Sequence, residues 1–158
     1  MSAKAVRAMG FRVSSEAALR NEAMDEWFFR GARSREVVGL NVGDVWFRLD
    51  NQLMHDGSSG MGSGGVGAFE VSDADVRGAL MSLRDIEDVS VEAQPIVLWH
   101  SHVNTVEPSE HDVEHLPEWC MYGLVFHVPS RTTTKYGHGA RHSALSAGKF
   151  EPLVDIKE

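Results

Sequence analysis

Short β-type runs alternate with helical segments along this 158-residue chain, and this alternation limits its fold more than any other feature. The β-type runs are rich in Val, Leu and aromatic residues and cover residues 37–42, 45–53, 95–100 and 121–128. Helices are expected at about 15–30, 72–84 and 108–116. This order predicts a mixed α/β fold, with one curved mixed β-sheet flanked by helices.

Local capping and turn signals indicate where these segments end. Ser14 or Ser15 can cap the first helix, and Gly31 can stop it. Gly43-Asp44 is typical of a tight hairpin turn between the first two strands. Ser72 opens the next helix with a capping-box-like pattern.

The chain shows no internal repeat and no domain boundary, so we expect a single domain over residues 1–158. Its core covers about 15–128. Residues 129–158 are expected to be a C-terminal loop and tail, because residues 129–142 carry basic side chains and no acid. An edge strand is expected within this tail at 150–156.

Charge and cysteine content exclude several classes of protein. The formal net charge of −8 argues against a partner held through a nucleic-acid backbone, which needs Lys and Arg. The single cysteine, Cys120, can form neither an internal disulfide nor a Cys-rich zinc site. No apolar run approaches the ~20 residues of a membrane helix, and the N-terminus lacks a secretory apolar block. We therefore expect a cytoplasmic protein.

A glycine-rich segment lies at residues 57–67, and its part 62–67 matches the pattern GxGxxG. The dinucleotide-binding interpretation requires a strand before this pattern and a helix directly after it. Here a strand-like segment, 68–71, follows instead. We therefore expect a flexible surface loop, either a plain connector or a strand-like contact for an extended substrate.

The most informative residues are two histidines, His100 and His102, at the end of a predicted strand. Side chains at i and i+2 of a strand point to the same face, so both imidazoles can converge on one zinc ion. Asp112, at the start of the following helix, can supply a third ligand and leave a fourth position open for water. A His-x-His pair can also simply pack at a strand end, and Ser109 to Asp112 can be a plain capping box.

Two other zinc patterns fit less well. His111 and His115, with Glu114, match the His-x-x-Glu-His pattern of inverzincins. Pro117 ends that helix almost at once, so both histidines are expected on its exposed side or at the rim of the site. A zinc deaminase needs a Pro-Cys-x-x-Cys pattern, which a single cysteine cannot provide.

Taken together, these residues resemble the signature of the JAMM (MPN⁺, JAB1/MPN/Mov34) zinc metallopeptidases. That signature is His-x-His, seven residues, then Ser-x-x-Asp, with a glutamate far upstream. This chain has His100-Ser101-His102 and, after six residues, Ser109-x-x-Asp112. Glu36, in Glu36-Val37-Val38-Gly39-Leu40, is similar to the family's Glu-x-x-Gly-Leu. The resemblance covers most of residues 15–128 and implies an MPN-like fold.

The resemblance also implies a role for each matched residue. His100, His102 and Asp112 would ligate Zn²⁺. Glu36 would take a proton from the metal-activated water and pass it to the leaving amine, and Ser109 would hydrogen-bond the developing oxyanion. Without catalysis, Glu36 would be a solvated acid at a strand start and Ser109 only a helix cap.

The family resemblance further implies hydrolysis of a peptide or isopeptide bond in a protein or peptide substrate, such as a ubiquitin-like or phage tail protein. His-Ser-His-Val-Asn followed by Glu-Pro-Ser-Glu is similar to stand-alone bacteriophage tail-assembly members, which places the protein in a host cytoplasm or a virion tail. The alternative is a weakly active or inactive MPN-fold scaffold within a larger assembly. Trp46, Trp99 and Trp119 are expected in the core.

Overall fold

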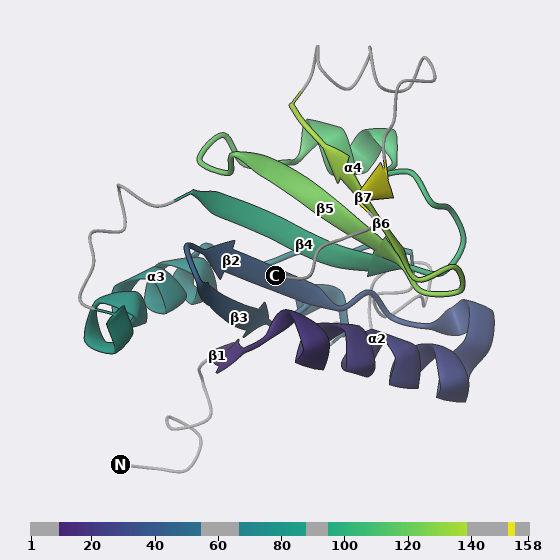
Figure 1. Ribbon diagram of the computed structural model, residues 1–158, viewed down its shortest axis with the longest axis horizontal. Coiled ribbons are helices and arrows are strands. Elements are labelled where there is room, and N and C mark those ends of the chain that lie inside the picture. The colour runs from purple at the N-terminus through teal and green to yellow at the C-terminus, as the bar shows by residue number, and fades with distance from the viewer. Residues whose placement is uncertain (1–9, 55–66, 88–94, 139–151, 154–158) are drawn as a thin grey trace.

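A seven-stranded sheet forms the centre of the protein, in the strand order β1-β3-β2-β4-β5-β6-β7 (Figure 1). The computed structural model describes residues 10–54, 67–87, 95–138 and 152–153. β4 and β5 pair in parallel, and the other described pairs are antiparallel. The strands are Phe11–Ser14 (β1), Val38–Val42 (β2), Val45–Leu49 (β3), Ile96–His102 (β4), Tyr122–His127 (β5), Thr132–Tyr136 (β6) and Pro152–Leu153 (β7).

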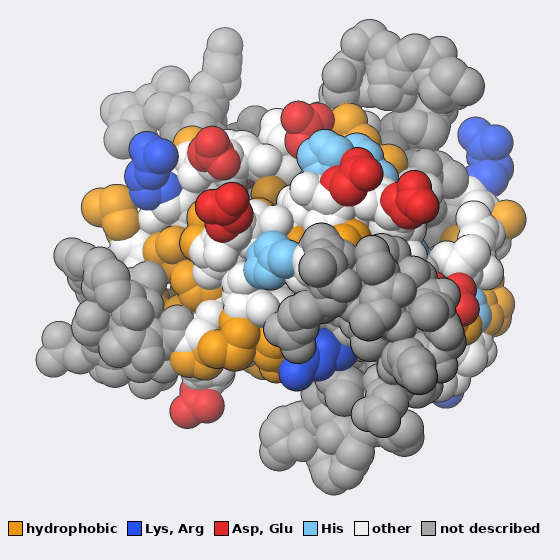
Figure 2. Space-filling model, turned by 90° about the horizontal axis from the view of Figure 1, so that it is seen from above, with side chains coloured by type: hydrophobic (Ala, Val, Ile, Leu, Met, Phe, Trp, Pro, Cys, Tyr) orange, Lys and Arg blue, Asp and Glu red, His pale blue; other side chains and the backbone are white. Residues whose placement is uncertain are grey.

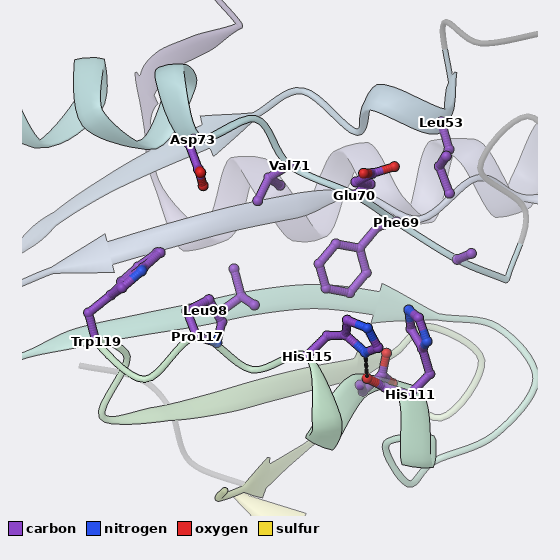
Figure 3. Close-up of a pocket in the computed structure, with 12 residues that line it drawn as sticks. Leu53, Phe69, Glu70, Val71, Asp73, Leu98, His111, His115, Pro117 and Trp119 are labelled. Atoms are coloured by element: carbon purple, nitrogen blue, oxygen red, sulfur yellow. Dashed lines mark hydrogen bonds between the residues drawn. The ribbon is translucent and has the colours of Figure 1, made fainter.

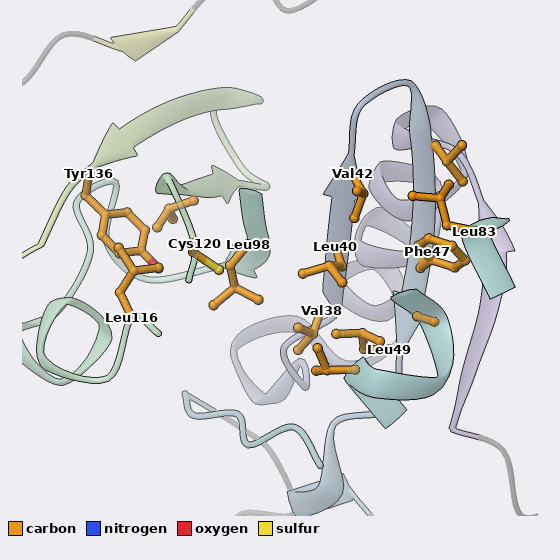
Figure 4. Close-up of a cluster of buried hydrophobic side chains, with 14 of the residues drawn as sticks. Val38, Leu40, Val42, Phe47, Leu49, Leu83, Leu98, Leu116, Cys120 and Tyr136 are labelled. Atoms are coloured by element: carbon orange, nitrogen blue, oxygen red, sulfur yellow. The ribbon is translucent and has the colours of Figure 1, made fainter. Parts of the chain in front are cut away.

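Helices cover both faces of this sheet (Figure 1). On one face, Leu19 of α2 packs in a buried cluster with Trp99 and Phe126. The opposite face carries a second cluster, to which α3 and the α4 region contribute, among others, Leu83 and Leu116 (Figure 4). The predicted mixed α/β class, a mixed sheet flanked by helices, is therefore confirmed. The helices are α2 (Glu16–Arg30), α3 (Asp73–Glu87) and α4 (Glu110–Glu114), with 3₁₀ turns η1 (Gly31–Arg33) and η2 (Gln52–Met54).

The capping and turn residues act as their chemistry predicts. The Ser15 hydroxyl accepts the Ala18 backbone N–H at 3.0 Å and begins α2, which ends at Gly31 with a φ of 58°. Gly43 has a φ of 61° in the two-residue turn between β2 and β3, where left-handed backbone is required. Ser72 accepts backbone N–H groups at the start of α3.

The expected loop over 129–142 is wrong for residues 132–136, because Thr132–Tyr136 forms β6 and pairs with β5, and residues 139–142 lie outside the described residues. Its basic residues suggested solvent exposure, yet Thr133, Thr134 and Tyr136 are buried by the sheet contacts. Threonine is β-branched and favours strands, and here this propensity outweighs the local positive charge. β7 lies within the expected edge strand, and β1 was not predicted.

Two smaller expectations also differ. Segment 68–71 is irregular chain rather than a strand. Apolar residues at positions 18, 19, 23, 27 and 28 predict one buried stripe along α2, but Phe28 is 80% exposed. Residues 57–66 of the glycine-rich loop lie outside the described residues.

Within the described part of the chain, the helices are all too short or too polar to cross a membrane.

Candidate metal centre

The carboxyl end of β4 brings His100 and His102 onto one face of the sheet. β4 lies between β2 and β5, so His100 is flanked by Val38 and Val125 and is fully buried. His102 is 8% exposed. Their Nε2 atoms are 3.1 Å apart, which confirms that the i and i+2 side chains converge.

Asp112 reaches these histidines from the first turn of α4. Ser109 caps this helix: its Oγ accepts the Asp112 N–H at 3.0 Å, and its own N–H donates to Asp112 Oδ2 at 2.9 Å. The same Oδ2 atom lies 3.2 Å from Nε2 of His100 and 3.2 Å from Nε2 of His102. The capping box thus aims one carboxylate oxygen at both imidazoles.

Glu36 approaches from the residues just before β2. The backbone around it is fixed by Ser101, whose Oγ accepts the Val37 N–H at 2.9 Å, and by Asn51, whose side chain donates to the Glu36 carbonyl at 3.0 Å. Glu36 is 7% exposed, and its Oε2 is 3.8 Å from His102 Nε2. Its Oε1 has no hydrogen-bond partner among the described residues.

The environment sets the charge of each group. Burial raises the pKa of Glu36 to about 8, although the nearby His102 opposes this. Burial lowers the pKa of His100. For Asp112, burial alone would raise the pKa, but the hydrogen bonds with His100 and His102 prevail and hold the pKa well below its ordinary range. Asp112 is therefore a carboxylate and His100 a neutral imidazole at neutral pH, the states in which these groups bind a metal.

The arrangement fits a metal ion. Ligands of a tetrahedral zinc at ~2.0–2.1 Å lie ~3.3–3.4 Å from one another. The three separations among His100 Nε2, His102 Nε2 and Asp112 Oδ2 are 3.1, 3.2 and 3.2 Å. Glu36, His100 and His102 also form a group whose ligand atoms lie within 4.8 Å of one another. Two imidazole nitrogens and a carboxylate oxygen suit zinc and other divalent transition metals.

His102 has a backbone partner that orients its ring. Its Nδ1 lies 3.2 Å from the Thr105 carbonyl oxygen, which accepts an Nδ1–H and turns Nε2 toward the cluster. Burial alone would lower the pKa of His102, but the hydrogen bond with Asp112 and the charge of Glu36 raise this pKa, so a metal ion at Nε2 would displace the proton there. The Phe69 ring packs against the His100 ring, with ring centroids 4.6 Å apart. The sequence gives no sign of either Thr105 or Phe69, because both lie in irregular segments without a periodic pattern.

Two hollows reach the cluster. Glu36, His102 and Ser109 line a cavity of about 170 Å³. Asp112 lines a groove of about 570 Å³, together with Phe69 and other residues (Figure 3). The structure thus brings His100, His102, Asp112 and Glu36 together and places Ser109 beside them.

Two expectations about neighbouring residues have different outcomes. His111 and His115 are exposed, as expected, and stack with ring centroids 3.9 Å apart at the edge of the groove (Figure 3). Trp99 is buried as expected and Trp46 is half-buried. The core prediction for Trp119 is wrong, because this side chain is 45% exposed and lines the groove.

Comparison of the chain with models of known protein families, with curated proteins and with solved structures gives no match. The fold and the site by themselves define the class of this protein. It is an α/β domain with a buried cluster of two histidines and one carboxylate that could hold a metal, and a second carboxylate lies beside this cluster.

Proposed function

We propose that this protein is a zinc-dependent peptidase or isopeptidase of the JAMM type, acting on a protein or peptide substrate. The observation that carries the proposal is the convergence of His100, His102 and Asp112, with Glu36 on the cavity side of the cluster. His100, His102 and Asp112 would hold Zn²⁺, which supplies Lewis acidity and a water of lowered pKa.

Glu36 would move the proton in this proposal. Its carboxylate is buried, stands 3.8 Å from His102 and lines the same cavity as Ser109. A base with a pKa near the working pH can both accept a proton from water and return it to a leaving amine. Burial raises the pKa of Glu36 to about 8 in the metal-free site, and the positive charge of a bound Zn²⁺ would lower it again, toward the pKa of a base that works at neutral pH.

Ser109 is placed to donate a hydrogen bond. Its Oγ accepts the Asp112 N–H, which leaves the hydroxyl hydrogen free to turn toward the cavity. A donor aimed at a developing oxyanion contributes about 3 kcal/mol to lowering the barrier. Ser109 would therefore stabilise the oxyanion while still capping α4.

Zinc stoichiometry tests the metal site. Zinc is measured by plasma mass spectrometry on the purified wild type, on His100→Ala/His102→Ala, and on His111→Ala/His115→Ala as a histidine-matched control. We expect one zinc per chain in the wild type and the control, and none in the first variant. Zinc lost only in the control would move the site to α4.

Hydrolysis is tested with a proteome-derived peptide library, in which new termini are identified by mass spectrometry. Glu36→Gln serves as the inactive control. Termini that depend on Glu36 support the peptidase. Zinc bound without any new terminus would favour the scaffold alternative, since the metal would then serve only the fold.

A further inference from the structure

The groove of about 570 Å³ continues from Asp112 to Trp119, beyond the reach of the catalytic groups (Figure 3). We propose that it binds an extended, cationic peptide segment, and that Trp119 and Asp73 form a subsite for a Lys or Arg side chain. That the segment belongs to the cleaved substrate rests on the proposed function; the binding itself does not.

The floor of the groove is apolar. Phe69 and Val71 line it from the irregular segment before α3, and Leu98 lines it from β4 (Figure 3). Asn51 fixes that irregular segment, because its side chain donates to the Ala68 carbonyl and accepts the Glu70 N–H. A pre-formed apolar floor with fixed walls suits alternate side chains of an extended peptide.

The walls of the groove are anionic. Apart from Asp112, which belongs to the candidate metal centre, its lining includes Glu70 and Asp73, and no Lys or Arg is among the described residues that line it. The residues of both walls belong to two long stretches of the chain, 50–76 and 85–130, and neither stretch contains a Lys or an Arg. Figure 2 shows acidic side chains gathered around histidines on one face of the molecule. This charge favours a cationic partner and disfavours an acidic one.

The far end of the groove has the parts of a cation site. The Trp119 indole and the Asp73 carboxylate face the groove from opposite walls (Figure 3). An indole face attracts a guanidinium or ammonium group, and a carboxylate beside it adds direct charge pairing. Trp119 is 45% exposed, so a ligand can reach its ring.

Asp73 is not needed to begin α3. The Ser72 hydroxyl already accepts the N–H groups of Ala74 and Asp75 at 3.1 and 3.3 Å. No hydrogen bond or ion pair joins the Asp73 side chain to another described residue. Its carboxylate is therefore available to a ligand.

The test measures peptide binding by fluorescence anisotropy in the Glu36→Gln background, where the peptide stays intact and the groove lining is unchanged. The probes are three labelled heptapeptides: Ser-Val-Arg-Val-Lys-Val-Ser, and the same peptide with both cations replaced by Gln or by Glu. We expect the cationic probe to bind about tenfold more tightly than the Gln probe, and more weakly as salt rises. The Glu probe should bind least.

Variants then locate the subsite. Asp73→Asn and Trp119→Leu should each weaken the cationic probe about fivefold. The matched controls Asp25→Asn and Trp27→Leu remove the same groups from exposed positions on α2 and should leave the affinity unchanged. Equal binding of all probes, no binding, or equal effects of Asp73→Asn and Asp25→Asn would overturn the inference. These results do not depend on zinc or turnover, so charge-dependent binding without zinc would reject only the proposed function.

Discussion

The Oδ2 atom of Asp112 closes the capping box with the Ser109 N–H at 2.9 Å and, in the same position, faces both histidine Nε2 atoms at 3.2 Å. One oxygen thus serves the start of α4 and the candidate metal centre. Separate substitutions can distinguish these two roles.

Asp112→Asn should weaken zinc binding by at least about 100-fold while α4 keeps its cap. The amide oxygen can still accept the Ser109 N–H, but it lacks the charge and basicity of a ligand carboxylate. Competition with a chromogenic zinc chelator gives the affinity, and circular dichroism reports the fold. Unchanged zinc affinity would remove Asp112 from the ligand set.

Ser109 can be tested for both of its roles. Ser109→Ala should lower the free energy of unfolding by about 1 kcal/mol, because a helix cap is lost. Glycine is a better cap than alanine, so Ser109→Gly should cost only a few tenths of a kcal/mol. Both variants lack the hydroxyl, and both should lower kcat by about 100-fold or more. If kcat instead falls only in the variant that loses stability, Ser109 acts as a helix cap and has no role in catalysis.

Glu36→Gln should retain zinc and lower kcat by about 10³-fold, since the amide has the same shape and cannot take a proton. The measurement pairs zinc content with turnover on the peptide that the library identifies. Glu22→Gln is the matched control, because Glu22 pairs with Arg48 away from the cluster. Normal turnover in Glu36→Gln would remove Glu36 from its proposed role.

The reactivity of the Cys120 thiol tests the packing of the core around it. Burial raises the pKa of its thiol to about 12, so almost no thiolate exists at pH 8. Cys120 should fail to react with Ellman's reagent in the native protein and should react fully in 6 M guanidinium chloride. Rapid reaction of the native protein would contradict the packing around Cys120.

Substitution of Gly123 tests the position of β6, one of two strands that the sequence did not predict. A Cβ atom at Gly123 would clash with Cζ of Tyr136, because the tyrosine ring of β6 crosses over the glycine of β5. Gly123→Ala should lower the free energy of unfolding by about 1–3 kcal/mol. In urea denaturation, the cost should shrink in a Tyr136→Leu background. Additive effects would indicate that the two residues do not touch.

Local chemistry alone predicted much of this protein. Both ends of α2 and the start of α3 follow from Ser15, Gly31 and Ser72, because caps act through neighbouring backbone groups. The shared face of His100 and His102 follows from the two-residue period of a strand. Such features depend on residues a few positions apart, so a single sequence determines them.

Only the tertiary structure decided what surrounds those elements. Burial of Thr133 and Tyr136 depends on β5 lying beside β6, and the exposure of Trp119 depends on the groove between α4 and the segment that carries Phe69. The approach of Glu36 to His102 likewise depends on β2 pairing with β4. These relationships arise from contacts between segments that are far apart in the sequence. Such contacts stabilise the fold but leave no periodic pattern of residues from which they could be predicted.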